Sequence, residues 1–188
     1  MYISIVIPAY NESGNLFQLI DSCNRVLESI GQSYEIIVIN DGSTDDTLEQ
    51  LIKLLNIFSH LHVIDLSRNF GKEAALTAGL DAATGSAVIP MDADHQHPPE
   101  LIPLMINRWQ DGFDVVLCRR ASRKSDRWLQ RHIARLFYRI HNAVSEVELP
   151  HDVGDFRLLD RKVVNALKLM PERRRFMKGV FAWVGFRT

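Results

Sequence analysis

Hydrophobic and polar positions along the first two thirds of the chain follow two alternating periods. Short apolar runs with the length and composition of buried strands occupy residues 3–7, 34–39, 61–66, 87–91 and 114–117. Apolar positions at helical spacing fill the intervening segments, at residues 15–30, 45–56, 72–83 and 99–110. Strands that alternate with helices favour a largely parallel sheet with helices on both faces. We therefore predict an α/β fold.

The whole chain fits one globular domain. It has 188 residues, of which 46% are hydrophobic, and it contains no internal repeat or low-complexity linker. Neither a signal peptide nor a membrane-spanning segment is expected within it, because there is no basic start and no long apolar run. Cys23 and Cys118 lack metal-ligand spacing, so we expect two free, packed thiols in a reducing compartment.

Two carboxylates follow the apolar run at residues 87–91 and are the main candidates for chemistry. Asp92 and Asp94 would emerge at the carboxyl end of that strand, where open α/β sheets bind ligands. On an extended backbone, positions i and i+2 point to the same side, and Gln96 continues the series. Hard oxygen ligands suit Mg²⁺ or Mn²⁺, which completes its shell with water and substrate oxygens. The pattern therefore predicts a divalent-metal site at Asp92, Asp94 and Gln96.

The same carboxylates also fit a purely structural turn. An Asp-rich turn commonly caps a following helix, and Pro98 and Pro99 introduce one here. His95 and His97 share a spacing that could bind a metal on a strand, although a surface turn is the simpler explanation for them. These residues by themselves leave both interpretations open.

Polar turns follow the first three predicted strands, and we expect them at one edge of the sheet. After the first strand, Tyr10 could stack on a base or pack within the turn. After the second, Asp41 could accept hydrogen bonds from a base or ribose, whereas residues 43–45 are better placed to cap the next helix. After the third, Lys72 brings a cation to a helix start, where anions are favoured. Neither a P-loop nor a dinucleotide-binding glycine motif is present.

Charge is divided unevenly along the chain, although the net charge is only −1. Residues 1–118 contain 5 Lys and Arg against 16 Asp and Glu, whereas residues 119–188 contain 17 against 7. An acidic half suits a cation with its nucleotide, and a basic half suits an anionic surface or a phosphate-bearing acceptor. Two solvated faces with segregated charges would give the same counts.

A basic amphipathic helix is predicted within residues 123–144. Its arginines recur every four residues, at Arg123, Arg127, Arg131, Arg135 and Arg139. Apolar side chains fall roughly opposite to them on the helical wheel. Such a helix can lie on a membrane with its arginines on anionic headgroups, or dock on the sheet with a solvated basic face. A second basic cluster, at residues 171–179, could contact phosphate.

Four motifs, in this order, resemble family 2 glycosyltransferases of the GT-A fold. They are Pro8-Ala9-Tyr10-Asn11-Glu12, Asp41-Gly42-Ser43-Thr44-Asp45, Asn69-Phe70-Gly71-Lys72 and Asp92-Ala93-Asp94-His95-Gln96-His97-Pro98. Residues 152–161 are similar to the subgroup that makes polyprenyl-phosphate sugars, such as dolichyl-phosphate mannose synthases and bactoprenol glucosyltransferases. The resemblance spans essentially the whole chain and implies a Rossmann-like, mostly parallel sheet flanked by helices.

The resemblance also implies roles for individual residues. Contacts with the nucleotide sugar would come from Pro8, Tyr10, Glu12, Asp41, Lys72, Asp92, Ala93 and Arg119. Asp92, Asp94 and Gln96 would hold Mg²⁺ or Mn²⁺ against the diphosphate, which also makes Asp94 important for catalysis. Asp155 would lie near the reacting centre, as a base or as an orienter of the acceptor, with Arg157 as its partner.

The activity implied by the resemblance is inverting transfer of a hexose to a polyprenyl phosphate at the cytoplasmic face of the cell membrane. The donor would be a nucleotide sugar of the UDP-glucose or GDP-mannose type. Residues 1–118 would bind this donor, residues 119–188 would face the acceptor and an anionic membrane surface, and membrane helices would follow the chain. A homo-oligomer is left open, and no nucleic-acid partner is expected.

Two other classes of function also fit the residues. One is a non-catalytic module that binds nucleotide sugars or membranes and keeps the fold without turnover. The other is a phosphotransferase that uses Asp92 as a nucleophile, because that chemistry also places carboxylates at a strand end.

Overall fold

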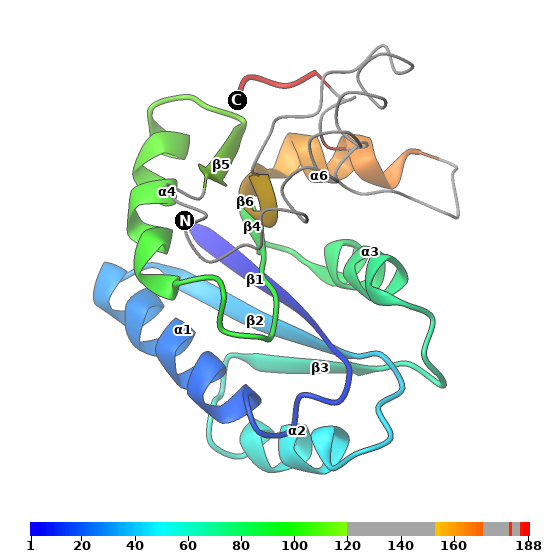
Figure 1. The fold of residues 1–188 in the computed structure, drawn as a ribbon. Helices are drawn as coiled ribbons and strands as arrows, with labels where there is room; N and C mark the ends of the chain where they lie inside the picture. The colour runs from blue at the N-terminus through cyan, green and yellow to red at the C-terminus, as the bar shows by residue number, and fades with distance from the viewer. Residues whose placement is uncertain (120–152, 171–180, 182–184) are drawn as a thin grey trace, which may run out of the picture.

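The sheet of this protein is built mainly from strands near the start of the chain. A computed structural model describes residues 1–119, 153–170, 181 and 185–188, and Figure 1 shows their arrangement. Six strands pair in the order β3-β2-β1-β4-β6-β5. They are β1 (Tyr2–Ala9), β2 (Ser33–Asn40), β3 (Leu61–Asp65), β4 (Ala87–Pro90), β5 (Val115–Arg119) and β6 (Val153–Asp160).

Helices cover both faces of this sheet. They are α1 (Leu16–Ile30), α2 (Thr47–Leu55), α3 (Lys72–Ala82), α4 (Ile102–Gln110) and α6 (Arg161–Lys168), with a 3₁₀ turn at Pro99–Leu101. Within the described residues, each predicted helix and strand is confirmed to within two residues at either end, except that the first turn of the segment at residues 99–110 is 3₁₀. The helix predicted within residues 123–144 lies outside the described residues. Pro99 begins that turn, in keeping with the preference of proline for the start of a helix.

The strand pairing is parallel in one part of the sheet and antiparallel in the other. β1 pairs in parallel with β2 and β4, and β2 pairs in parallel with β3, so the predicted parallel sheet is confirmed for these four strands. β6 lies between β4 and β5 and runs antiparallel to both. Neither the strand β6 nor the helix α6 was predicted from the sequence.

Two apolar layers form the core, one on each face of the sheet. Alternate residues of β1 divide between them: Ile3, Ile5 and Ile7 pack with α1, α2 and α4, whereas Val6 packs with α3 and α6. In Figure 1, α1 and α4 lie on the face opposite α3 and α6. The strands are therefore apolar on both sides, which explains why they appear in the sequence as continuous hydrophobic runs.

Both cysteines are free in the structure, as expected. Cys23 lies on the buried side of α1 and is fully buried, and Cys118 of β5 is partly buried. Burial, assisted by the negative charge of Glu100, raises the pKa of Cys23 to about 12. This thiol is therefore a neutral packing group at physiological pH.

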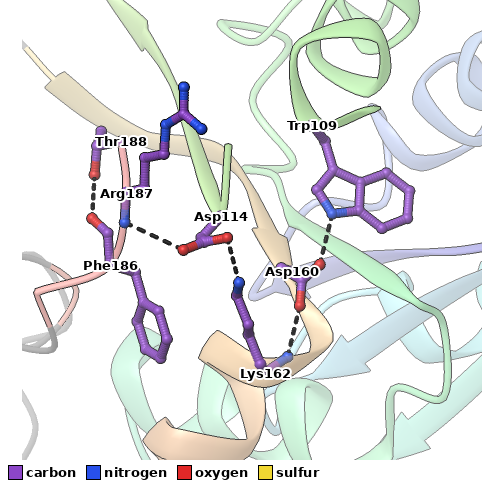
Figure 2. A network of polar contacts seen from close by, with 7 residues as sticks. All are labelled: Trp109, Asp114, Asp160, Lys162, Phe186, Arg187 and Thr188. Atoms are coloured by element: carbon purple, nitrogen blue, oxygen red, sulfur yellow. Dashed lines mark hydrogen bonds and ion pairs between the residues drawn. The ribbon is translucent and has the colours of Figure 1, made fainter. Parts of the chain in front are cut away.

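A polar network closes the end of the fold at which β5 and β6 lie (Figure 2). Asp160 accepts hydrogen bonds from the Trp109 indole N–H of α4 (2.7 Å) and from the Lys162 main-chain N–H of α6 (2.8 Å). Asp114 pairs with the Lys162 ammonium at 2.5 Å and accepts from the Arg187 N–H at 3.3 Å. The network thus joins α4, β6, α6 and the last described residues. Across the described parts of the chain, no helix is long and apolar enough to span a bilayer.

Candidate functional site

The carboxyl ends of β1, β2 and β4 open into a cavity of about 310 Å³. Its lining residues are Pro8, Ala9, Tyr10, Glu12, Asp41, Asn69, Gly71, Lys72, Asp92, Ala93 and Asp94. The register of the strands brings these segments level, because Ala9 pairs with Asn40 and Val6 pairs with Pro90. All the predicted donor-binding residues whose side chains the structure describes therefore lie around one cavity. Ala9, Asn69 and Gly71 were missing from the prediction, although the motifs quoted from the sequence contain all three.

The loops after β1 and β2 are joined by a set of short hydrogen bonds. The Asn11 N–H donates to Ser43 Oγ at 3.0 Å, and the Thr44 N–H donates to Asn11 Oδ1 at 2.8 Å. The Glu12 N–H donates to Thr47 Oγ1 at 2.9 Å. Asn11 adopts a left-handed backbone with φ 56°, which asparagine tolerates better than most residues. The loop that presents Tyr10 and Glu12 is consequently fixed to the start of α2.

Asp45, one residue before the N-cap Asp46, holds the first main-chain N–H of α2. Its Oδ1 accepts from the Thr47 N–H at 3.0 Å and from the Thr47 hydroxyl at 2.5 Å. Its pKa lies below the ordinary value, because hydrogen bonds from Thr47 and Ser13 outweigh the opposing effect of desolvation. Asp45 is therefore a structural residue of this loop, as its position in the sequence suggested.

Asp41 anchors the loop that follows β3. Its side chain is only 2% exposed, and its two oxygens accept from the main-chain N–H groups of Phe70 (2.8 Å) and Gly71 (2.9 Å). Gly71 has a φ of 94°, a conformation that favours glycine. From the sequence, Asp41 was expected to be available to a base or ribose. The structure shows that it also holds the turn leading into α3, and its contact with a nucleoside stays a prediction.

Asp92 lies between a cation and a buried imidazole. The Lys72 ammonium, from the first residue of α3, is 2.6 Å from Asp92 Oδ1. The Asp92 N–H donates to His97 Nδ1 at 3.0 Å, and the His97 ring stacks on Phe156 of β6 with centroids 5.1 Å apart. His97 is 7% exposed, so the expectation of a surface-turn histidine is wrong for this residue. A neighbouring strand, which the local sequence does not reveal, covers it.

The chain turns sharply after Asp94. Asp94 Oδ1 accepts from the Gln96 N–H at 3.0 Å, and His95 between them has a left-handed φ of 59°. His95 Nε2 lies 3.1 Å from the Asn15 carbonyl oxygen at the start of α1. The extended backbone expected through residue 96 is therefore not found, because β4 already ends at Pro90. Gln96 does not line the cavity, and its role as a metal ligand stays a prediction.

The chemistry of the cavity suits a divalent ion bound partly by substrate. Within the described residues, no three His, Cys, Asp or Glu side chains are placed to enclose a metal. Asp92 and Asp94 supply two hard carboxylates, and the Lys72 ammonium already occupies a cation position beside one of them. Mg²⁺ and Mn²⁺ commonly bind through one or two carboxylates and complete their shell with water and phosphate oxygens. The residues present therefore fit such an ion.

Three of the predicted site residues lie on β5 and β6 and are only partly described. Arg119 is the last residue of β5 and Asp155 belongs to β6, and the structure describes their backbones alone. Arg157 of β6 is 4% exposed, with its guanidinium carbon 4.2 Å from the centroid of the Phe181 ring. It is not among the residues that line the cavity. The basic segments at residues 123–144 and 171–179 lie outside the described residues.

The fold and cavity together define an α/β protein with a polar ligand site at a topological switch point. β1 has β2 on one side and β4 on the other, so the strand order changes direction between β1 and β4. Ligands of open α/β sheets bind in the crevice outside the carboxyl ends of the strands at such a point. The chain belongs to glycosyl transferase family 2, since residues 4–168 match the sequence pattern of that family. The resemblance seen in the motifs is thereby confirmed.

Relatives of known name match along the whole chain. It is 51% identical over 185 residues to an uncharacterised glycosyltransferase of Synechocystis. It is 47% identical over 189 residues to the prophage bactoprenol glucosyl transferase homolog of Escherichia coli. The matches cover 98% and 100% of this chain but only 58% and 61% of those relatives. The chain thus spans about three fifths of their length.

Solved structures establish the fold class. The mannosyltransferase of Pyrobaculum calidifontis, solved in complex with GDP-Man and Mn²⁺, superimposes with a TM-score of 0.67 at 20% sequence identity. The superposition covers 98% of this chain and 53% of that protein. The expected GT-A fold, with its mostly parallel sheet flanked by helices, is confirmed.

Proposed function

We propose that this domain transfers a hexose from a nucleoside diphosphate sugar to a polyprenyl phosphate, with inversion at the anomeric carbon. The observation that carries the proposal is the cavity at the β1–β4 switch point, in which Asp92, Asp94 and Lys72 come together. The relatives support the choice of acceptor, because one of them at 47% identity is named as a bactoprenol glucosyl transferase homolog. The donor would be of the UDP-glucose or GDP-mannose type.

The donor would lie across the carboxyl edge of β1, β2 and β4. Tyr10 is 44% exposed at the cavity and can stack against a base, while Pro8 and Glu12 border the same space. Asp92 and Asp94, with Gln96, would hold Mg²⁺ or Mn²⁺ beside the diphosphate. A bound ion of this kind supplies Lewis-acid stabilisation to a departing diphosphate. Lys72 places a further positive charge where the phosphates would lie.

Transfer requires positioning more than it requires a strong base. The acceptor phosphate is already an anion at neutral pH, so its oxygen can attack the anomeric carbon directly. One bond forms between that oxygen and the anomeric carbon as the bond from the carbon to the diphosphate oxygen breaks. Holding the two substrates in line supplies much of the rate enhancement. In this proposal Asp155 orients the acceptor or takes a proton, with Arg157 as its partner.

The proposal assigns different tasks to the two halves of the chain. Residues 1–118 bind the donor, and the basic residues 119–188 gather the lipid phosphate at an anionic membrane, at its cytoplasmic face. The counts of charged residues support this division, with acidic residues in excess in the first half and basic residues in the second.

A transfer assay tests the proposal. The purified protein would be incubated with radiolabelled UDP-glucose or GDP-mannose, undecaprenyl phosphate in detergent and either Mg²⁺ or Mn²⁺, and lipid-linked sugar would be counted. Asp92→Asn and Asp94→Asn should each lower the rate by at least about a hundredfold, because both remove a charged group from the site at which the diphosphate departs. Asp111→Asn is the matched control, since Asp111 only pairs with Arg108 on the surface at 3.6 Å.

Wild-type rates in both cavity variants would contradict the proposal. Nucleotide-sugar binding without transfer in the presence of the lipid would instead indicate a non-catalytic module. Formation of an acid-stable aspartyl-phosphate at Asp92 would indicate the phosphotransferase.

A further inference from the structure

Lys72 and Asp92 form an ion pair in the wall of the cavity. The ammonium nitrogen is 2.6 Å from Asp92 Oδ1, and the two side chains are 46% and 25% exposed. Both residues line the cavity. A partly exposed pair of this kind contributes little to stability, so one partner can be replaced at small cost. The pair is therefore well suited to exchange with other ions.

The charges around the cavity explain why the pair exists. Among the described residues that line it there are four carboxylates, those of Glu12, Asp41, Asp92 and Asp94, and one Lys or Arg side chain, that of Lys72. Asp41 is engaged with the main chain at Phe70 and Gly71, and Glu12 accepts from the Asn15 amide at 2.6 Å. Asp94 accepts from the Gln96 N–H at 3.0 Å, so Asp92 is the lining carboxylate whose charge Lys72 balances. A cavity with this balance repels a diphosphate until cations are added.

The base of the Lys72 side chain is fixed, although its tip can move. Lys72 is the first residue of α3 and follows Gly71, whose N–H is held by Asp41 at 2.9 Å. From this fixed position, a flexible four-carbon stem carries the ammonium group. The ammonium can therefore reach different acceptors inside one cavity without any shift of the backbone.

We propose that Lys72 is an exchangeable counter-ion of the donor site. In the ligand-free protein it neutralises Asp92, and when a divalent ion and a nucleoside diphosphate enter together, the ammonium transfers to the diphosphate. This inference rests on the proposed function and deepens it. Its consequence is that Lys72 competes with a metal that arrives alone but assists a metal that arrives with nucleotide. The two ligands are then coupled through one side chain, and each favours the binding of the other.

Two binding measurements on the full chain test the inference without any turnover. The first is the affinity for Mn²⁺ alone, followed by the electron paramagnetic resonance signal of free Mn²⁺. The second is the affinity for UDP or GDP at saturating Mn²⁺, followed by calorimetry. Lys72→Met should bind Mn²⁺ alone about three- to tenfold more tightly, because a positive charge a few ångströms from the ion is gone. The same variant should bind the nucleotide about tenfold or more weakly, because a charge-assisted hydrogen bond to phosphate is lost.

The opposite signs of the two changes distinguish this role from a structural one. Lys53→Met is the matched control, because Lys53 forms a surface pair with Glu49 at 2.7 Å and its loss should change neither affinity. Lys72→Arg keeps the charge and should retain both the competition with Mn²⁺ and most of the nucleotide affinity. It also keeps the test informative if the methionine variant folds poorly.

Unchanged or weaker Mn²⁺ binding in a folded Lys72→Met variant would overturn the inference. Its failure can be told apart from failure of the proposed function. A protein that transfers no sugar but shows both opposite changes keeps the Lys72 inference and loses the transfer. A protein that transfers sugar but has the same Mn²⁺ affinity with and without Lys72 keeps the proposed transfer and loses the Lys72 inference.

Discussion

Asp41 offers a sharp test because two roles predict different results for the same variant. In Asp41→Asn, an amide NH₂ replaces one of the two oxygens that accept from Phe70 N–H and Gly71 N–H. One main-chain donor then faces another donor in a site that is 2% exposed. A hydrogen bond to a charged acceptor is worth about 1.5–3 kcal/mol, and leaving a buried donor unpaired costs a similar amount. We expect the free energy of unfolding to fall by about 2–3 kcal/mol.

Urea unfolding followed by circular dichroism measures this change, and calorimetry with nucleotide at saturating Mn²⁺ measures the effect on binding. Binding should weaken as well, because the loop that Asp41 holds leads directly into Lys72. Asp46→Asn is the control. Asp46 lies in the same loop but is exposed and makes no side-chain cap hydrogen bond, so its loss should change stability by no more than about 0.5 kcal/mol. Full stability of Asp41→Asn together with weakened nucleotide binding would refute the anchoring role and leave direct contact with the nucleoside as the function of Asp41.

Two further predictions concern the rigid parts of the fold. Gly79→Ala should lower the melting temperature, because the added Cβ would overlap the Val6 side chain. The cost of overpacking exceeds the gain in helix propensity, so the free energy of unfolding should fall by about 1–2 kcal/mol. A higher melting temperature would contradict this. For Glu35, burial alone would raise the pKa, but hydrogen bonds from Ser4 and Thr84 outweigh it and the pKa lies below the ordinary 4.5. The ionised group therefore stabilises the fold above that pH and loses this contribution as the pH falls through the lower folded value. Urea unfolding should show a deficit for Glu35→Gln that is largest at neutral pH and shrinks in acid, and a deficit independent of pH would exclude the carboxylate as its cause.

Much of the fold could be predicted because most strands and helices of the core have a recognisable pattern of apolar residues in the local sequence. β1, β2 and β4 are covered on both faces and appear as apolar runs, and turns mark their ends. β6 leaves a weaker trace, because charged Asp155 and Arg157 alternate with its apolar residues. The burial of Arg157 against Phe181 depends on contacts between distant segments, which no local period reveals.

The site shows the same division between local and distant information. The sequence motifs located the cavity residues because the loops that follow parallel strands gather at one sheet edge. The partners of those residues could not be predicted. The pairing of Asp92 with Lys72, the stacking of His97 on Phe156 and the anchoring by Asp41 each join segments far apart in the chain.

The pairing of β5 with β6 brings together two residues that are far apart in the sequence. Arg119 is the partner of Val153, so the described residues on either side of residues 120–152 are adjacent in the sheet. The cost of closing a loop grows only slowly with its length, so a segment that begins and ends at such a pair can change in size with little effect on the strands beside it. The cavity at β1, β2 and β4 lies on other strands. The sheet that carries the cavity can therefore accept segments of different length at this point.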